Sequence, residues 1–410
     1  MTILHTVKSY SSLAGGMYEV VRQISENLKK RGHEITIASC RKPDNYSSNI
    51  NVELFDFSKE NEIKRYQDYL IDSDFDIITN FAAQQPMTDL MLPILQKIKA
   101  KKVFVPTGFN ALQSKTHKTY FENMKTWLAQ YDLNIFLSNN YQDINFARIN
   151  NVPESKITII PNGASKEEFF DIKTLNIKEK LKINKNNLLI LHVGSFTGVK
   201  GHYEAIEIFS KANIKNATLL LIGNGDNFCS KKTKEESEKL NSTVSFKKNN
   251  KNILIKELNR EDTVSVYKES DIFLFPSNTE CSPIVLFEAM AAGIPFLTSE
   301  VGNTKEIIEW SNGGILLPTY QNIILGENYI EKIKKYLKKF LIRIGFNLWN
   351  PDIQYAKVDI NKSIKIFEEL CLNTKKRKEL GNNGREAWLN KFTWEKISER
   401  YEAEYMKLLN

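Results

Sequence analysis

Short apolar runs rich in β-branched residues alternate with amphipathic stretches, and this alternation occurs twice along the chain. The first series has strand-like runs at 2–7, 34–39, 76–81, 102–107, 134–139 and 157–163, and the second has them at 188–196, 217–225, 271–277, 294–299 and 313–318. Strands that alternate with helices form parallel sheets with helices on both faces. We therefore predict an α/β fold of two doubly wound, Rossmann-like domains that face each other across a central cleft. In such sheets, ligands bind beyond the carboxyl ends of the strands.

The length of 410 residues also favours two domains, because a single core of this size is uncommon. We expect the N-terminal domain at 1–168 and the C-terminal domain at 169–392. Two insertions are expected in the second domain, near 229–252 and near 320–356. The first of these is rich in lysine and asparagine and should be solvated and mobile.

The composition excludes some classes of protein. The four cysteines lack the spacing of a zinc site or a disulfide framework and suit a reducing compartment; they are Cys40, Cys229, Cys281 and Cys371. The N-terminus is too short and polar for a signal peptide, and no apolar run is long enough to cross a bilayer. We therefore expect a cytoplasmic protein. Its net charge of +8 permits a nucleic acid, a nucleotide phosphate or an anionic membrane as a partner.

Residues 329–349 form a separate feature. At helical spacing, apolar residues from Ile330 to Leu348 fall on one side, and lysines together with Arg343 fall on the other. Such a basic amphipathic helix can lie on an anionic membrane surface. Alternatively, the helix packs on its own domain and exposes a solvated basic face. Ile342 and Phe346 interrupt the polar side and favour this alternative.

Two glutamates, Glu280 and Glu288, flank an apolar run. Proline is favoured at the first position of a helix, so Ser282 and Pro283 predict a helix from Pro283 to Ala292. Glu280 then lies in the loop before this helix and Glu288 on its flank. Carboxylates placed in this way suit an elongated ligand with its anionic centre at the helix N-terminus, rather than one acid/base pair. The alternative is a helix cap followed by a surface glutamate.

Two glycine turns follow predicted strands. In 191–201 a strand runs into a turn that contains Gly194 and ends at Lys200 and Gly201, but the spacing fails the pattern of a nucleotide-binding P-loop. The second turn, at 223–225, lacks the third glycine of a dinucleotide fingerprint. Either turn alone could be a solvated loop.

Taken in order, these motifs resemble glycosyltransferase family 4, the retaining nucleotide-sugar transferases of the GT-B fold. The E-x7-E element with the following "EAMAAGIP" is the most specific match. The similar stretches cover most of the chain and lie at 15–37, 152–163, 192–206, 221–226, 266–302 and near 380–405. The resemblance implies that the last helix, 393–410, returns to the N-terminal domain.

The resemblance also implies roles for individual residues. Glu280 and Lys200 would be catalytic: Glu280 would hold the donor sugar, and Lys200 would neutralise the departing diphosphate. Glu288 would accept hydrogen bonds from the ribose, and Gly15 and Gly16 would let the backbone approach the donor phosphates. Further donor contacts are expected from the two glycine turns and the helix start, at Gly194, Ser195, Gly223, Ser282, Ile284 and Val285.

The chain departs from the family pattern at two places. Ser195 replaces a usual arginine, which leaves more of the phosphate charge to Lys200 and the helix N-terminus. Thr107 and Gly108 replace a histidine that commonly touches the donor sugar, and His117 is a candidate substitute on the acceptor or sugar side. The sequence Asp74-Phe75-Asp76 matches a metal-binding D-x-D, but it directly precedes a strand, where capping the chain is the expected role.

We therefore expect a retaining, metal-independent glycosyltransferase of hexosyltransferase type, with no cofactor beyond a nucleoside-diphosphate sugar. The acceptor would be a hydroxyl of a glycan, lipid-linked molecule or protein, in cell-surface glycan or glycoconjugate assembly, and no nucleic acid is expected. Residues 329–349 suggest a place at the cytoplasmic face of a membrane. The alternatives are a non-catalytic sugar- or nucleotide-binding module and a nucleotide-sugar 2-epimerase.

Overall fold

The structure is a computed structural model that describes residues 1–11, 15–42, 49–171, 176–320 and 356–410. The chain divides into two compact units. Unit 1 consists of Met1–Gly163, Cys281–Ile284 and Lys391–Asn410, and unit 2 consists of Ala164–Glu280 and Val285–Asn390. The predicted insertion at 320–356 lies almost entirely outside the described residues. The segment 329–349 lies entirely outside them.

Unit 1 is built on a parallel sheet of seven strands in the order β3-β2-β1-β4-β5-β6-β7. The order reverses direction at β1, as in a doubly wound sheet. Apolar side chains of β1 and β4 are fully buried, which is why these strands read as continuous apolar runs. The strands are β1 (Thr2–Val7), β2 (Glu34–Ser39), β3 (Asn51–Leu54), β4 (Ile77–Phe81), β5 (Lys101–Val105), β6 (Leu133–Phe136) and β7 (Ile157–Ile159).

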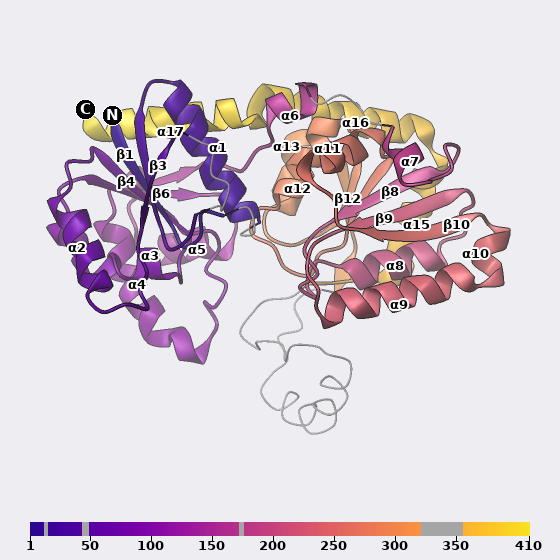
Figure 1. Cartoon of the computed structure of the whole chain (residues 1–410), viewed down its shortest axis with the longest axis horizontal. Helices are drawn as coiled ribbons and strands as arrows, with labels where there is room; N and C mark the ends of the chain where they lie inside the picture. Colours follow the sequence, from indigo (N-terminus) through magenta and orange to yellow (C-terminus); the bar gives the residue numbers. More distant parts are fainter. Residues whose placement is uncertain (12–14, 43–48, 172–175, 321–355) are drawn as a thin grey trace. The chain divides into compact units, whose positions relative to one another are not determined.

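Helices cover both faces of this sheet (Figure 1). The helix α1 (Gly16–Lys30) packs against α17 (Trp394–Leu409), so the last helix of the chain belongs to unit 1. Its buried Tyr405 lies within hydrogen-bond distance of Thr79 of β4, with 2.7 Å between the two hydroxyl oxygens. The remaining α-helices of unit 1 are α2 (Glu62–Asp72), α3 (Pro86–Asp89), α4 (Lys118–Gln130) and α5 (Gln142–Ile149).

Unit 2 repeats the plan with a parallel sheet of six strands in the order β10-β9-β8-β11-β12-β13. Figure 1 shows α8 and α9 on one side of this sheet and α11, α12 and α13 on the other. The strands are β8 (Leu188–Val193), β9 (Ala217–Ile222), β10 (Lys251–Lys256), β11 (Ile272–Phe275), β12 (Phe296–Ser299) and β13 (Gly314–Leu317). The first helices are α6 (Lys166–Asp171), α7 (Ile177–Lys180), α8 (His202–Lys211), α9 (Phe228–Ser242) and α10 (Val244–Lys248), followed by α11 (Arg260–Glu269), α12 (Ile284–Ala292), α13 (Thr304–Ser311), α15 (Ile360–Leu372) and α16 (Thr374–Ala387).

The predicted α/β class with two doubly wound sheets is confirmed, but the expected mobile insertion at 229–252 is wrong. These residues form most of α9, all of α10 and the start of β10. A capping box begins α9, because Asn227 accepts a hydrogen bond from the Ser230 amide and the Ser230 hydroxyl accepts one from Asn227. Most of these lysines therefore lie on solvated helix faces. The strand β10 was not predicted, because it begins and ends with lysines, Lys251 and Lys256.

Candidate active site

The first predicted glycine turn follows β8 and is fixed by close backbone packing. Gly201 has a φ of 78°, and a Cβ atom there would lie 2.1 Å from the Pro276 carbonyl oxygen. Gly223, which follows β9, would place a Cβ atom 2.2 Å from the Gly194 carbonyl oxygen. Both positions therefore exclude any side chain. The Gly194 amide donates to the Ile222 carbonyl (2.9 Å), which ties this turn to β9, and half-buried Ser195 follows it.

This turn brings Lys200 to Glu280. The strands β8 and β11 are neighbours, so the loops after their carboxyl ends lie side by side. The Lys200 ammonium contacts both carboxylate oxygens of Glu280, at 2.8 and 2.9 Å. Eight per cent of the Glu280 side chain and 29% of the Lys200 side chain are exposed. The two residues expected to be catalytic are thus paired with each other.

Ser277 forms a further hydrogen bond with this pair. Its hydroxyl donates to Glu280 Oε1 at 2.8 Å, and its carbonyl accepts a hydrogen bond from the Ser299 hydroxyl. Ser277 and Ser299 are completely buried. The carboxylate of Glu280 is therefore held in one orientation by a lysine on one side and a buried hydroxyl on the other.

The helix expected after Glu280 is present and begins one residue later than predicted, at Ile284. Ile284 and Val285 occupy its first turn, where backbone N–H groups have no partner within the helix. Ser282 lies in the preceding segment, 9% exposed, and its carbonyl accepts a hydrogen bond from Asn162 at 2.9 Å. The segment Cys281–Ile284 groups with unit 1 and the rest of α12 with unit 2.

Glu288 lies on the buried flank of α12 and has a different cation. Arg260 Nη1 lies 2.5 Å from Glu288 Oε1, and only 6% of the Glu288 side chain is exposed. The same guanidinium contacts Glu168 of α6, with 2.6 Å between Nη2 and Oε2. Burial raises the pKa of Glu288, while the charge of Arg260 opposes this rise. Each glutamate of the E-x7-E element thus has its own cation.

In unit 1, Gly15 caps α1 and Gly16 is its first residue. Thr107, Gly108 and Phe109 form a turn in which all three residues have positive φ angles, of 57°, 110° and 50°. This conformation is costly for a β-branched residue such as Thr107.

Helix α5 holds this turn in place. Gln142 donates hydrogen bonds to the carbonyls of Gly108 and Phe109. Asp143 is fully buried, which raises its pKa to about 6.

Comparison with known proteins shows what the chain is similar to. The family model described as "Glycosyl transferases group 1" matches residues 173–340. An N-acetyl-alpha-D-glucosaminyl L-malate synthase of Bacillus anthracis is 25% identical over 184 residues, 44% of this chain and 45% of that protein. An uncharacterized glycosyltransferase of Methanocaldococcus jannaschii is 25% identical over 329 residues, 74% of this chain and 81% of that protein. The chain is thus similar to the group 1 glycosyl transferases over residues 173–340.

Two further comparisons concern one relative and one solved structure. A UDP-Gal:alpha-D-GlcNAc-diphosphoundecaprenol alpha-1,3-galactosyltransferase of Escherichia coli is 25% identical over 239 residues, 55% of this chain and 59% of that protein. The matches to the Bacillus and Escherichia proteins thus span about half of those relatives. HepE of Anabaena, solved in complex with UDP, has a TM-score of 0.70 at 14% identity over 99% of this chain and 100% of that chain. This likeness shows the fold, which is GT-B.

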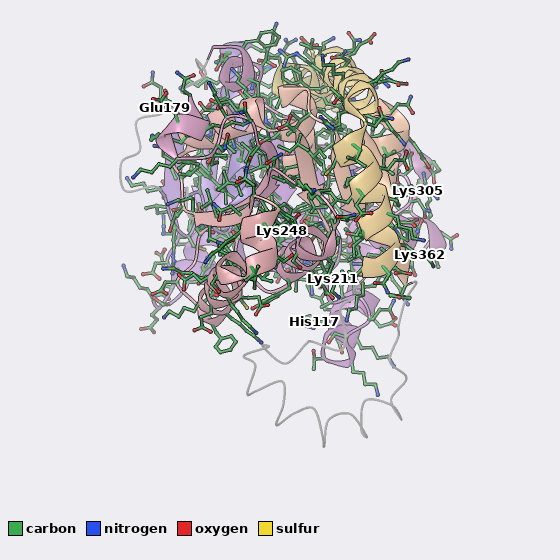
Figure 2. All side chains as sticks on the ribbon, turned by 90° about the vertical axis from the view of Figure 1, so that its right-hand side faces the viewer. His117, Glu179, Lys211, Lys248, Lys305 and Lys362 are labelled. Atoms are coloured by element: carbon green, nitrogen blue, oxygen red, sulfur yellow. The ribbon has the colours of Figure 1, made fainter. Side chains whose placement is uncertain are left out.

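The described histidines make contacts within their own units. His117 contacts Thr116, with 3.0 Å between Nδ1 and Oγ1, and Figure 2 shows it at the edge of unit 1. His33 Nε2 lies 2.7 Å from Glu402 Oε1 of α17. The rings of His192 and His202 meet edge to face, with 4.5 Å between their centroids, and burial lowers the pKa of His192 to about 4.

The D-x-D sequence has the capping contacts expected for it. Asp76 Oδ2 accepts a hydrogen bond from the Thr2 amide at 2.7 Å, and Asp74 accepts one from the Thr2 hydroxyl through its carbonyl. Within the described ranges, no three histidine, cysteine or acidic residues gather as a metal site. Over the same residues, no helix is long and apolar enough to cross a membrane.

Sequence reasoning missed Arg260 and Ser277. A signal for Arg260 was available, because an arginine in the first turn of a helix stands at the positive end of the helix dipole. A cation in that unfavourable place indicates a specific anionic partner. Ser277 ends the strand-like run 271–277 that precedes Glu280, and only the folded chain shows that its hydroxyl contacts the carboxylate.

Proposed function

We propose that this protein is a glycosyltransferase that moves a sugar from a nucleoside-diphosphate sugar to a hydroxyl acceptor, with retention of anomeric configuration and without a metal ion. The observation that carries this proposal is the Lys200–Glu280 pair at the carboxyl ends of β8 and β11. It joins a cation suited to a diphosphate with an acceptor suited to sugar hydroxyls. The start of α12, a helix of nine residues, lies nearby in the sequence and adds the positive end of a helix dipole.

In the proposed reaction, the diphosphate takes the place of Glu280 as the partner of Lys200. Glu280, still held by Ser277, then accepts hydrogen bonds from the sugar hydroxyls. The bond from the anomeric carbon to the phosphate oxygen breaks, and the acceptor oxygen bonds to the same face of that carbon. The acceptor proton passes to the departing phosphate oxygen. The protein contributes orientation and charge stabilisation, and no strong base is needed.

The other expected site residues keep their proposed roles. Gly194, Ser195, Gly223, Ser282, Ile284 and Val285 are proposed donor contacts, as are Gly15 and Gly16 of unit 1. The turn at Thr107 and Gly108, held by Gln142, is the proposed contact on the sugar or acceptor side. It is favoured over His117 because strained backbone often marks a functional site.

We further propose an acceptor in glycan or lipid-linked glycan assembly, with the protein in the cytoplasm at the inner face of a membrane. The name of the Escherichia coli relative, which includes a diphosphoundecaprenol sugar, supports this acceptor class. The basic amphipathic segment 329–349 supports the membrane location by its sequence.

The test is turnover of UDP-, GDP- and ADP-sugars by the purified protein, measured as release of the nucleoside diphosphate, with EDTA present and absent. We expect one donor class to be hydrolysed slowly in the absence of acceptor and faster with a hydroxyl acceptor, and NMR of the product to show retention. EDTA should leave the rate unchanged. Binding of a donor without turnover would instead indicate a non-catalytic module, and loss of the rate with EDTA would contradict metal independence.

A further inference from the structure

Arg260 forms an ion pair with the buried carboxylate of Glu288, and this pair has no part in the proposed reaction. The guanidinium of Arg260 lies between two carboxylates, with Glu288 of α12 on one side and Glu168 of α6 on the other. Its Nε also contacts Glu168, at 3.2 Å from both carboxylate oxygens. Each of the three guanidinium nitrogens therefore contacts a carboxylate, Nε and Nη2 that of Glu168 and Nη1 that of Glu288.

We propose that Arg260 is a positioning residue that keeps Glu288 charged and oriented to accept hydrogen bonds from the two hydroxyls of the donor's ribose. This inference rests on the proposed function. Arg260 would thus determine the preference for ribose over deoxyribose. It would do so by contacting Glu288, without touching the nucleotide.

The number of acceptor sites on Glu288 suits this role. A carboxylate offers about four lone-pair positions. Arg260 uses one of them. About three positions remain, which is enough for the two hydroxyls of a vicinal diol. A ligand would reach these positions through the 6% of the Glu288 side chain that is exposed.

The charges around Glu288 explain why Arg260 is needed. In the described part of the chain, the titratable groups that act on Glu288 are Arg260 and Tyr267 on α11 and Glu168 on α6. Burial and the negative charge of Glu168 both raise the pKa of Glu288, and Arg260 is the cation that lowers it. Without Arg260, two carboxylates would face each other at a largely buried position, and Glu288 would take up a proton.

A protonated Glu288 is a poor ribose acceptor, because its hydroxyl becomes a donor and one of its acceptor positions is lost. Loss of Arg260 should therefore weaken recognition of the ribose hydroxyls near neutral pH. Recognition should return at higher pH, where Glu288 ionises even without its cation. A residue that only tied α6 to α11 would lower stability but would not produce this dependence on pH.

The test is the dissociation constant of UDP, GDP or ADP, whichever the wild type binds, and of its 2′-deoxy counterpart, measured by calorimetry between pH 6.5 and 9. Hydrogen bonds to a charged group predict that the wild type prefers the ribonucleotide by about tenfold or more at pH 7. Arg260→Gln should reduce this preference to less than about threefold at pH 7 and regain it toward pH 9. Arg260→Lys, which keeps the charge, should retain most of the preference at pH 7.

Lys180→Gln is the matched control. Lys180 of α7 forms an ion pair of 2.6 Å with Asp262, which lies on α11 as Arg260 does. It should leave the preference unchanged. An unchanged preference in Arg260→Gln at pH 7, or a loss that does not return at pH 9, would overturn the role of Arg260. Absence of nucleoside diphosphate binding in the wild type would instead overturn the proposed function.

Discussion

Two ion pairs of unit 2, Lys200–Glu280 and Arg260–Glu288, have carboxylates of similar burial but differ in the cation. Lys200 is a point charge on a flexible stem and contacts a single carboxylate. Arg260 is a planar fork that binds carboxylates on two helices at once. In the proposed reaction, Lys200 exchanges the carboxylate for a phosphate, whereas Arg260 keeps its partners. The comparison supports the proposal that the first pair acts in the reaction and that Arg260 positions Glu288.

The largest effect is expected when the Lys200–Glu280 pair is broken. Lys200→Ala should lower kcat by about 10²–10³-fold, because it removes the cation that would stabilise the departing diphosphate. Steady-state rates with a saturating donor measure this. Lys211→Ala is the control, since Lys211 lies on α8 at the surface of unit 2, as Figure 2 shows, and pairs with Glu207 one turn away. A loss of less than about fivefold in Lys200→Ala would contradict the role of this pair.

The next effect concerns the turn that carries Lys200. Gly201→Ala combines a positive φ with a clash against the Pro276 carbonyl, and should lower the free energy of unfolding by about 2–4 kcal/mol. Gly32→Ala has a positive φ but nothing within 4 Å of the new Cβ atom, and should cost about 1 kcal/mol. Urea unfolding of both variants gives the difference. Equal losses would show that the clash at Gly201 is relieved by movement of the turn.

Much of this arrangement could be predicted from the sequence, for physical reasons. The buried parallel strands are continuous apolar runs, so β1 and β8 were evident, and Pro283 marked the start of α12 within one residue. β10 was not evident, because its terminal Lys251 and Lys256 belong to a lysine-rich stretch. In the fold, Lys251 donates to three carbonyls at the end of α8, a contact between distant segments that no local pattern encodes.

The candidate site shows the same limit. Glu280, Glu288 and Lys200 stand in a recognisable pattern, but the pairing of Lys200 with Glu280 depends on β8 and β11 being neighbours, and this follows only from the strand order. Arg260 and Glu288 are 28 positions apart in the numbering and meet only because α11 and α12 lie on the same side of the sheet, as Figure 1 shows.

A smaller effect should come from the buried histidines of the two units. Burial lowers the pKa of His192, in unit 2, to about 4 and that of His5, in unit 1, to about 3. Since both stay neutral in the folded state, the unfolded chain binds more protons below pH 6.5, and stability falls as the pH falls from about 6.5 toward 4. Each contributes up to about 2–3 kcal/mol to this loss.

Urea unfolding between pH 7 and 4.5 tests this dependence. His192→Gln and His5→Gln should each flatten the fall in stability with pH, whatever they do to stability at pH 7, and His117→Gln is the control at the edge of unit 1. Unchanged slopes in both buried-site variants would mean that these histidines do not set the acid sensitivity of either unit.

The smallest expected effect concerns a carboxylate of unit 1, Asp76, which has only the amide and hydroxyl of Thr2 as partners in its described hydrogen bonds. Asp76→Asn should lower the free energy of unfolding by no more than about 1 kcal/mol, because the contact is at the surface and an amide oxygen can still accept from Thr2. If the D-x-D sequence only caps β4, kcat should be unchanged with Mn²⁺, Mg²⁺ or EDTA. A tenfold fall in kcat that depends on the metal would instead make Asp76 part of a metal site and would end its contrast with Glu280, whose charge the proposed reaction uses.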